Sequence, residues 1–327
     1  MKVDTLVAVD VGASRTRVCV GTDPQEFPGR EQPLIRDIRS VSALRRLLAD
    51  VRAGIDSGGP VRLCAGVAAP PADDDTRLMT NWSEDRVLRL SELEALGFDE
   101  VRVLNDLEAS AHGLVAFLDS SPSPEELVSF SDVPVPASGN RALVIPGSGL
   151  GSAGVIDLGR DAPKRWHVVS SEVGHVPASG TGKGILTAVQ RRKGSTPSWE
   201  DCVSGPGLEA LWVAMEPAHE DDPLSAPEIA YRASLGDQRC QQALHYYYYF
   251  AARFSQLLTL SYLSFGGLYL AGGSTRSNAP LISGAEFLTA FRDNDRMSEV
   301  LERIPVFLVL AEITLLGAWT AGWADRP

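Results

Sequence analysis

Asn105 and Asp106 stand where a short apolar stretch gives way to a helix-forming one, in the segment VRVLNDLEASAHGLV of residues 101–115. A carboxylate at the carboxyl end of a strand lies where open α/β sheets bind their ligands. The amino end of the following helix would keep Asp106 ionised and fix its direction. The pattern also fits an ordinary helix start, because Asn105 is a good N-cap and Glu108 completes a capping box. Taken alone, the segment is more typical of a helix start than of a catalytic base.

Two glycine-containing turns could bind an anion through backbone N–H groups. DVGASRTR at residues 10–17 and PGSGLGSAG at residues 146–154 each join two expected strands. Small residues there let N–H groups converge on a phosphate, and Asp10 could hold Mg²⁺ through water. The second turn is neither a dinucleotide fingerprint nor a Walker A loop, because it lacks the following helix and a Gly-Lys-Ser/Thr ending. A plain hairpin explains the first turn better, and a flexible surface loop explains the second equally well.

Three later segments carry polar side chains or glycines in loops or turns. SSEVGHV at residues 170–176 holds Glu172 and His175, whose carboxylate and imidazole can accept from and donate to vicinal sugar hydroxyls. A metal site there is a poor interpretation, because no third His or Cys is near. Glu200 precedes the turn SGPG at 204–207, and LAGGSTRSN at 270–278 has the shape of a nucleotide-binding wall. Each segment alone is equally a loop, a turn or a helix start.

The elements that would position these side chains follow from hydrophobic periodicity. Strands are expected at residues 5–11, 17–21, 61–67, 101–104, 141–145, 155–158, 166–170, 268–271 and 306–310. Helices are expected at 41–51, 90–96, from 106, 185–192, 208–215, 227–234, 237–264 and from about 313. Strands and helices alternate after each of two hairpins, which predicts an α/β protein with mixed sheets and two half-domains. Residues 119–140 are rich in Ser, Pro and acids and are expected to form a surface excursion.

Composition narrows the functional classes. The 327 residues suit one large or two medium domains, and a net charge of -12 argues against nucleic-acid and membrane partners. Four scattered cysteines support neither a zinc site nor disulfides, so a reduced, cytoplasmic protein is expected. No signal peptide is expected at the N-terminus. The apolar segment 304–323 contains Glu312 and Pro305, and we interpret it as a buried strand followed by a helix.

The motifs together resemble one family. DVGASRTR, LNDLEASAHG, GSGLG, SEVGH, SGPGL, LAGG and LLGAW follow the order found in bacterial hexokinase-type glucokinases of the actin-like ATPase superfamily, from about residue 7 to residue 318. The cysteine motif of the zinc-containing ROK kinases is absent. The resemblance implies a two-domain actin-like ATPase (ribonuclease H-like) fold with mixed sheets and an interdomain cleft. It implies a small domain of residues 1–114 plus 304–327, a large domain of residues 115–303, and compatibility with a homodimer.

The resemblance also implies an activity and a set of site residues. The activity would be ATP-dependent phosphorylation of D-glucose at the 6-hydroxyl, with Mg²⁺ as cofactor and Asp106 as general base. The implied substrate-binding residues are Asn81, Asn105, Asp106, Glu172, His175 and Glu200. The implied cofactor-binding residues are Asp10 (which would hold Mg²⁺ through water), Gly12, Ala13, Ser14, Arg17, Gly147, Ser148, Gly149, Gly272 and Gly273.

Two departures from the family pattern keep alternatives open. Ala13 stands where the family usually has Gly, and Pro146 precedes the second turn where a small flexible residue is usual. Both favour a second hypothesis, a sugar-binding regulator with little or no catalysis. No DNA-binding segment is expected before Val3, so a repressor is disfavoured. A third hypothesis keeps the kinase but changes the sugar to another hexose, or the donor to ADP or polyphosphate.

Overall fold

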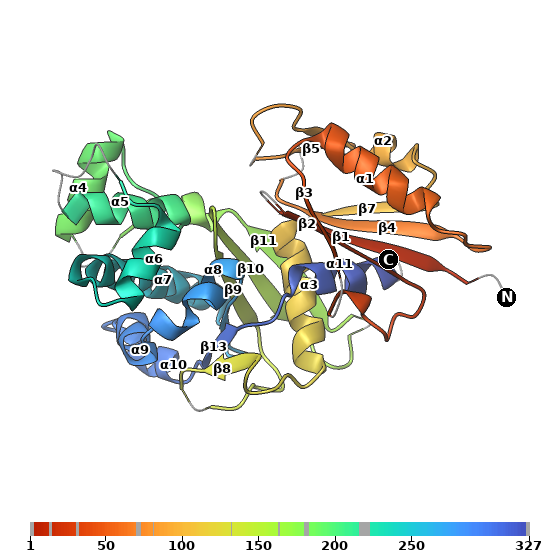
Figure 1. Ribbon diagram of the computed structural model, residues 1–327. Helices are drawn as coiled ribbons and strands as arrows, with labels where there is room; N and C mark the ends of the chain where they lie inside the picture. The colour runs from red at the N-terminus through yellow and green to blue at the C-terminus, as the bar shows by residue number, and fades with distance from the viewer. Residues whose placement is uncertain are drawn as a thin grey trace. The chain divides into compact units, whose positions relative to one another are not determined.

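The computed structural model describes residues 3–12, 15–30, 33–69, 73–80, 82–131, 133–162, 164–179, 183–215 and 223–324. The chain forms two compact units (Figure 1). Unit 1 comprises Met1–Pro122 and Glu312–Pro327, and unit 2 comprises Ser123–Ala311. Each unit holds a mixed β-sheet with helices, so the predicted α/β class is confirmed.

Unit 1 is built on a five-stranded sheet in the order β3-β2-β1-β4-β7. These strands are β1 (Thr5–Val11), β2 (Arg15–Gly21), β3 (Leu34–Asp37), β4 (Val61–Val67) and β7 (Glu100–Asn105). β1 pairs antiparallel with β2 and parallel with β4, so the predicted hairpin and mixed sheet are both present. The other elements are η1 (Pro28–Arg30), α1 (Val41–Ala53), the hairpin strands β5 (Thr76–Leu78) and β6 (Val87–Arg89), α2 (Leu90–Glu94), α3 (Asp106–Asp119) and α11 (Thr314–Trp323).

Both faces of the unit 1 sheet are covered, which explains why every residue of β1 is buried. Alternate side chains of a strand point to opposite faces. Val7 and Val9 pack in a core with Leu44 of α1, whereas Leu6 packs on the other face with Trp319 of α11. In Figure 1, α1 and α2 lie on one side of this sheet and α3 and α11 on the other.

Unit 2 is built on a six-stranded sheet in the order β11-β10-β9-β12-β13-β8. These strands are β8 (Leu127–Ser129), β9 (Arg141–Pro146), β10 (Leu150–Asp157), β11 (Trp166–Ser171), β12 (Leu268–Leu270) and β13 (Val306–Val309). β9 and β10 form the second predicted hairpin, and β12 runs parallel to β9 and β13. The helices are η2 (Val173–His175), α4 (Lys183–Lys193), α5 (Gly205–Met215), α6 (Ala226–Ser234), α7 (Gln238–Tyr262), α8 (Gly273–Asn278), η4 (Ala279–Leu281), α9 (Gly284–Arg292) and α10 (Ser298–Glu302).

Several details differ from the sequence expectations. β10 begins at Leu150 rather than at residue 155, because its glycine-rich first half pairs with β9. The expected excursion at residues 119–140 contains β8, which pairs with β13. The units divide at 122/123 and 311/312 rather than at the expected 114/115 and 303/304, because α3 runs on to Asp119 and β13 belongs to the unit 2 sheet.

The apolar segment at residues 304–323 forms a strand and a helix, as expected. β13 is buried along its whole length, and α11 begins five residues after it ends. Among the described residues, no helix combines the length and the apolar character needed to cross a membrane.

Candidate functional site

The junction of β7 and α3 holds Asp106 in a fixed position. The side chain of Asn105 accepts a hydrogen bond from the Leu107 N–H at 2.9 Å, and Oδ1 of Asp106 accepts from the same N–H at 2.9 Å. Glu108 accepts from the Asn105 N–H, which completes the predicted capping box; burial nevertheless raises the pKa of Glu108. The cap and a chemical role for Asp106 are therefore compatible, because Asn105 and Glu108 do the capping around it.

Asp10 lies in a buried cluster of charges in unit 1. It faces Arg17 in the β1–β2 register, and its Oδ2 accepts from Arg17 Nη1 at 2.8 Å. Arg17 Nη2 lies 3.6 Å from Oε2 of Glu312. Burial and then the Glu312 carboxylate raise the pKa of Asp10 to about 7, against the lowering effect of Arg17, and the charge of Asp106 raises it further. Two further carboxylates, of Glu312 and Asp106, thus act on Asp10 beside one guanidinium.

This excess of negative charge at Asp10 fits a cation. Among the described residues, no group of three or more His, Cys, Asp or Glu side chains could hold a metal ion by itself. Mg²⁺ does not require such a group, because it usually keeps several waters and binds one or two carboxylates together with substrate phosphates. The surroundings of Asp10 are consistent with the predicted Mg²⁺ contact through water.

The first predicted phosphate turn is described only at its edges. The N–H of Gly12 donates to the Arg15 carbonyl at 3.0 Å and closes the hairpin. Ala13 and Ser14, and the predicted sugar ligand Asn81, lie outside the described residues.

In unit 2 the structure brings Glu172, His175 and Glu200 together. His175 Nε2 lies 3.5 Å from Glu172 Oε2, and His175 Nδ1 lies 3.8 Å from Glu200 Oε1. Glu172 immediately precedes the short helix η2 after β11, and His175 is the last residue of η2. The backbone N–H of Glu200 donates to the Gly174 carbonyl at 2.9 Å. Two carboxylates and an imidazole that converge in this way can exchange hydrogen bonds with several hydroxyls of one ligand.

The second glycine turn lies directly against Glu200. Oε2 of Glu200 accepts from the Leu150 N–H at 2.9 Å, and a Cβ added to Gly149 would lie 2.6 Å from the same oxygen. The turn is closed by a 2.8 Å hydrogen bond from the Gly147 N–H to the Gly149 carbonyl. Within the described part of the chain, the N–H groups of Ser148 and Gly149 donate to no protein acceptor. These two N–H groups could therefore donate to an anion, and anion binding at this turn stays a prediction.

The same turn borders a pocket of about 390 Å³ in unit 2. Gly147 and Ser148 line it together with Gly273 at the start of α8. Gly272 adopts a φ of 97° that only glycine takes readily, and a Cβ there would lie 2.7 Å from Ile145. The volume falls in the range of small-molecule sites. The two glycine segments singled out in the sequence therefore meet at one pocket of ligand size.

Some residues of this constellation escaped the sequence analysis. Tyr247, Ser274 and Glu209 line the 390 Å³ pocket, and the Tyr247 side chain hydrogen-bonds to Ser274. The run Tyr246–Tyr249 could have been a signal, but four consecutive residues of a helix cannot all face one way, so the sequence alone does not show which ring reaches a pocket. Glu312 gave a signal too, as the one acidic residue in an otherwise apolar segment.

The predicted site residues therefore form two groups. Unit 1 carries Asp10, Gly12, Arg17, Asn105 and Asp106. Unit 2 carries Gly147, Ser148, Gly149, Glu172, His175, Glu200, Gly272 and Gly273. The first group includes the carboxylates of Asp10 and Asp106, and the second includes two carboxylates and an imidazole beside a glycine-rich turn.

Comparison with known proteins finds one family that matches nearly the whole chain. The family model described as Glucokinase matches residues 6–323. A glucokinase of Saccharophagus degradans is 29% identical over 331 residues, covering 98% of this chain and 98% of the relative. The chain spans 46% of the length of the bifunctional protein glk of Burkholderia thailandensis, to which it is 29% identical.

Solved structures share the fold. A glucokinase of Balamuthia mandrillaris in complex with glucose has a TM-score of 0.81 and 22% identity, over 98% of this chain and 94% of that chain. A ROK family glucokinase of Streptomyces griseus in complex with glucose and AMPPNP has a TM-score of 0.63 and 18% identity, over 97% of this chain and 99% of that one. At these identities the likeness establishes a common architecture.

Proposed function

The chain belongs to the Glucokinase family and is a sugar-phosphorylating enzyme of that family, and we propose that it transfers the γ-phosphoryl group of ATP to the 6-hydroxyl of D-glucose. The family membership confirms the resemblance drawn from the seven ordered motifs. The identity of the sugar, the position phosphorylated, the donor and the residue roles belong to the proposal.

One observation carries it: a hydroxyl-binding set lies directly against an anion-binding turn. Glu200 lies near His175 and also accepts from the N–H of Leu150, at the end of the Gly147–Gly149 turn. Phosphoryl transfer to an alcohol requires an acceptor hydroxyl and a donor phosphate to be held next to each other. The contact of Glu200 with the turn supports the proposal that a sugar held by Glu200 lies beside a phosphate held by the turn.

The sugar would be held by side chains that recognise hydroxyls. Glu172, Glu200 and Asn105 would accept or exchange hydrogen bonds with hydroxyls that do not react, and His175 would donate or accept according to its tautomer. The glucose complex of the Balamuthia relative supports this choice of ligand.

Asp106 would act on the reacting hydroxyl. Its carboxylate takes the proton of the 6-hydroxyl as the oxygen attacks phosphorus. The new O–P bond forms while the bond between the γ-phosphorus and the bridging oxygen breaks, and ADP leaves with the electron pair. The N-terminal turn of α3 stabilises the negative charge of this carboxylate before the reaction.

The nucleotide would be held largely by backbone groups. The 390 Å³ pocket lined by Gly273 and Ser148 would take the adenosine, and the N–H groups of Ser148 and Gly149 would bind its phosphates. Mg²⁺, when held through water by Asp10, would neutralise charge on those phosphates. The AMPPNP complex of the Streptomyces relative supports a nucleoside triphosphate as donor.

The test of the general base is Asp106→Asn. We expect the variant to keep glucose binding in calorimetry, because the amide preserves shape and can still cap, and to lose turnover by a factor on the order of 10²–10⁴. The matched control is Asp119→Asn at the exposed end of the same helix, which should keep wild-type turnover. Substantial residual turnover in Asp106→Asn would reject the role of Asp106.

The donor and the sugar are tested together in a coupled assay. D-Glucose and its epimers are offered with ATP, ADP or polyphosphate as donor, and we expect the highest kcat/KM for glucose with ATP. Sugar binding without any turnover or nucleotide binding would instead support a regulator, the alternative that Pro146 and Ala13 raised.

A further inference from the structure

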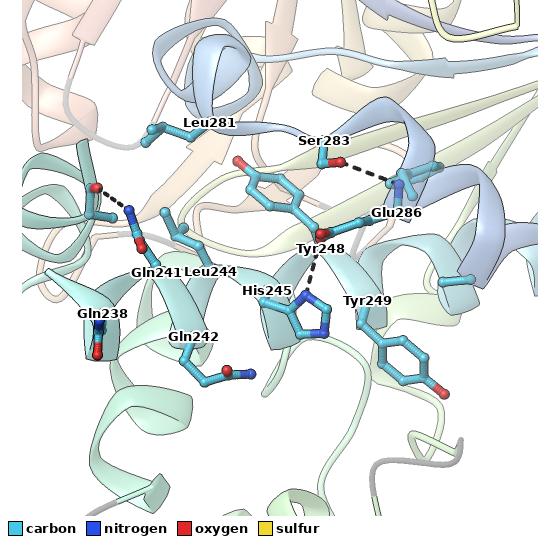
Figure 2. A pocket seen from close by; sticks show the side chains of 13 residues that line it. Gln238, Gln241, Gln242, Leu244, His245, Tyr248, Tyr249, Leu281, Ser283 and Glu286 are labelled. Atoms are coloured by element: carbon cyan, nitrogen blue, oxygen red, sulfur yellow. Dashed lines mark hydrogen bonds and ion pairs between the residues drawn. The ribbon is translucent and has the colours of Figure 1, made fainter. Parts of the chain in front are cut away.

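A second, larger cavity in unit 2 is lined by other residues than those of the pocket described above. It is a groove of about 610 Å³ between the first three turns of α7 and the segment that leads into α9 (Figure 2). No described residue lines both this groove and the 390 Å³ pocket. The groove is therefore a separate feature that the proposed reaction leaves unexplained.

Uncharged amide groups dominate one wall of the groove. Gln238, Gln241 and Gln242 follow each other along the start of α7, and all three side chains are exposed. Within the described residues, the side chains of Gln238 and Gln242 make no hydrogen bond, whereas Gln241 donates to the Ala233 carbonyl at 3.2 Å. A primary amide both donates and accepts, so this wall matches a ligand that also does both.

One acid–base pair joins the two sides of the groove. His245 Nδ1 lies 3.1 Å from Oε2 of Glu286, and Figure 2 shows this contact bridging α7 and α9. The backbone N–H of Glu286 is bound by Ser283 Oγ at 3.3 Å, which fixes the start of α9. The pair adds further acceptors and donors at a defined position in the groove.

The charge of the groove disfavours an anion. None of the described residues that line it is Lys or Arg, and Glu286 contributes a carboxylate. A phosphate or carboxylate ligand would therefore meet repulsion without a compensating cation.

The floor of the groove is apolar and partly aromatic. Leu244 and Phe287 are buried there, and the Tyr248 ring points toward the segment that carries Leu281 and Ser283 (Figure 2). A sugar combines an apolar C–H face with a rim of hydroxyls, so an apolar floor with amide walls is complementary to both.

From this lining, we propose that the groove between α7 and α9 is a second ligand site that binds a neutral polyhydroxylated molecule of the sugar class. The amides of Gln238 and Gln242 and the His245–Glu286 pair bind its hydroxyls, and Leu244, Tyr248 and Phe287 contact its C–H groups. The site is distinct from the proposed nucleotide pocket, because no described residue lines both, although Tyr247 of the pocket and Tyr248 of the groove are neighbours on α7.

Hydrogen–deuterium exchange of the full chain tests the site by position. D-Glucose, maltose and sorbitol are each added at ~20 mM, which would nearly saturate a site with a Kd of about 1 mM. We expect at least one of them to slow exchange in peptides covering residues 238–249 and 281–290, by about tenfold when its concentration is ten times Kd. Protection near residues 100–110 and 172–200 would report the proposed kinase site separately, so failure of one site is distinguishable from failure of the other.

Variants and a charged probe complete the test. Gln242→Ala combined with His245→Ala should abolish protection of the groove, whereas Leu257→Ala should preserve it, since Leu257 lies more than three turns further along α7. Glucose 6-phosphate should not protect the groove. The proposal is overturned if none of the three neutral probes protects these peptides, if the double variant is protected like wild type, or if glucose 6-phosphate protects as strongly as the neutral probes.

Discussion

At the scale of single residues, the protonation of Asp10 should make the free energy of unfolding depend on pH. Its pKa rises from an ordinary 3.8 to about 7, because burial and Glu312 outweigh Arg17. Between these values the folded state holds a proton that the unfolded chain releases, so the Asp10 contribution to stability is largest below the unfolded pKa and falls as pH rises. We expect wild type to lose unfolding free energy between pH 4.5 and 7.5, and Asp10→Asn to lose less of it, by on the order of a few kcal/mol.

Urea unfolding at several pH values measures this difference. Asp119→Asn, an exposed carboxylate of the same unit, is the control and should follow the wild-type pH dependence. A parallel course of the Asp10→Asn and wild-type curves would show that Asp10 is not the buried acid described here.

Removal of the Glu200 carboxylate and removal of the Glu172 carboxylate should affect ligand binding differently. Glu200→Ala removes the acceptor of the Leu150 N–H and loosens the turn at residues 147–149, so both glucose and AMPPNP should bind more weakly, by roughly 1–3 kcal/mol each. Glu172 is 70% exposed, and among the described residues its side chain is paired with His175 and makes no hydrogen bond to the turn, so Glu172→Ala should weaken glucose binding alone. Calorimetry with each ligand makes the comparison, and equal effects of both variants on AMPPNP would contradict it.

Residue types and spacing predicted the local features of the candidate site, but not the contacts there between residues far apart in the sequence. Asn105 and Glu108 were predicted as caps because capping is local, and both caps are present. The approach of Glu200 to the glycine turn was not predictable, because about fifty residues separate it from Leu150 and only the folded chain joins them. Glu312 joins Arg17 for the same reason, across nearly the whole sequence.

At the scale of elements, two glycines set the distance between α3 and α11. A Cβ on Gly317 would lie 1.6 Å from the Ala109 carbonyl oxygen, and one on Gly113 would lie 1.8 Å from that of Ile313. Gly317→Ala must therefore push the helices apart, and we expect a loss of at least about 1–3 kcal/mol of unfolding free energy. Because α3 begins at Asp106, turnover should fall as well.

The matched control is a helical glycine with open space around it. A Cβ on Gly184 of α4 meets nothing within 4 Å. Gly184→Ala should raise the free energy of unfolding slightly, by at most about 0.5 kcal/mol, because alanine loses less backbone entropy in a helix but Gly184 is only the second residue of α4. Thermal unfolding of both variants tests the pair, and a neutral Gly317→Ala would show that the two helices separate at little cost.

Periodicity predicted long elements and missed short ones. α7 and the two hairpins carry enough residues for a clear pattern. β3, β5 and β6 have three or four residues each, and their pairing depends on partners elsewhere in unit 1. α8 begins after Gly272 in a left-handed conformation, which reads in sequence as a loop.

At the scale of the whole molecule, unit 1 is formed by two separate parts of the chain, and unit 2 lies between them in the sequence. The second part of unit 1 contains helix α11. The return is substantial: α11 buries Leu315, Ala318 and Trp319 in the core that includes Leu6 of β1. Arg102 of β7 donates to the Ala321 carbonyl at 2.8 Å. The unit 1 sheet therefore depends on residues that are synthesised after all of unit 2.

Removal of residues 312–327 should consequently destabilise unit 1 more than unit 2. Each large apolar side chain lost from the core removes roughly 1.5–3 kcal/mol, and one face of β1 and β4 becomes exposed. Hydrogen–deuterium exchange should show loss of protection in residues 5–11 and 61–67, while residues 141–146 and 268–270 stay protected by the sheet and helices of unit 2.

Trp319→Ala is a smaller change that tests the same point if the truncated chain does not accumulate, and it should shift protection in the same direction. Equal loss of protection in both units would mean that their cores do not act separately, and unchanged protection in β1 and β4 would mean that α11 does not hold the unit 1 sheet.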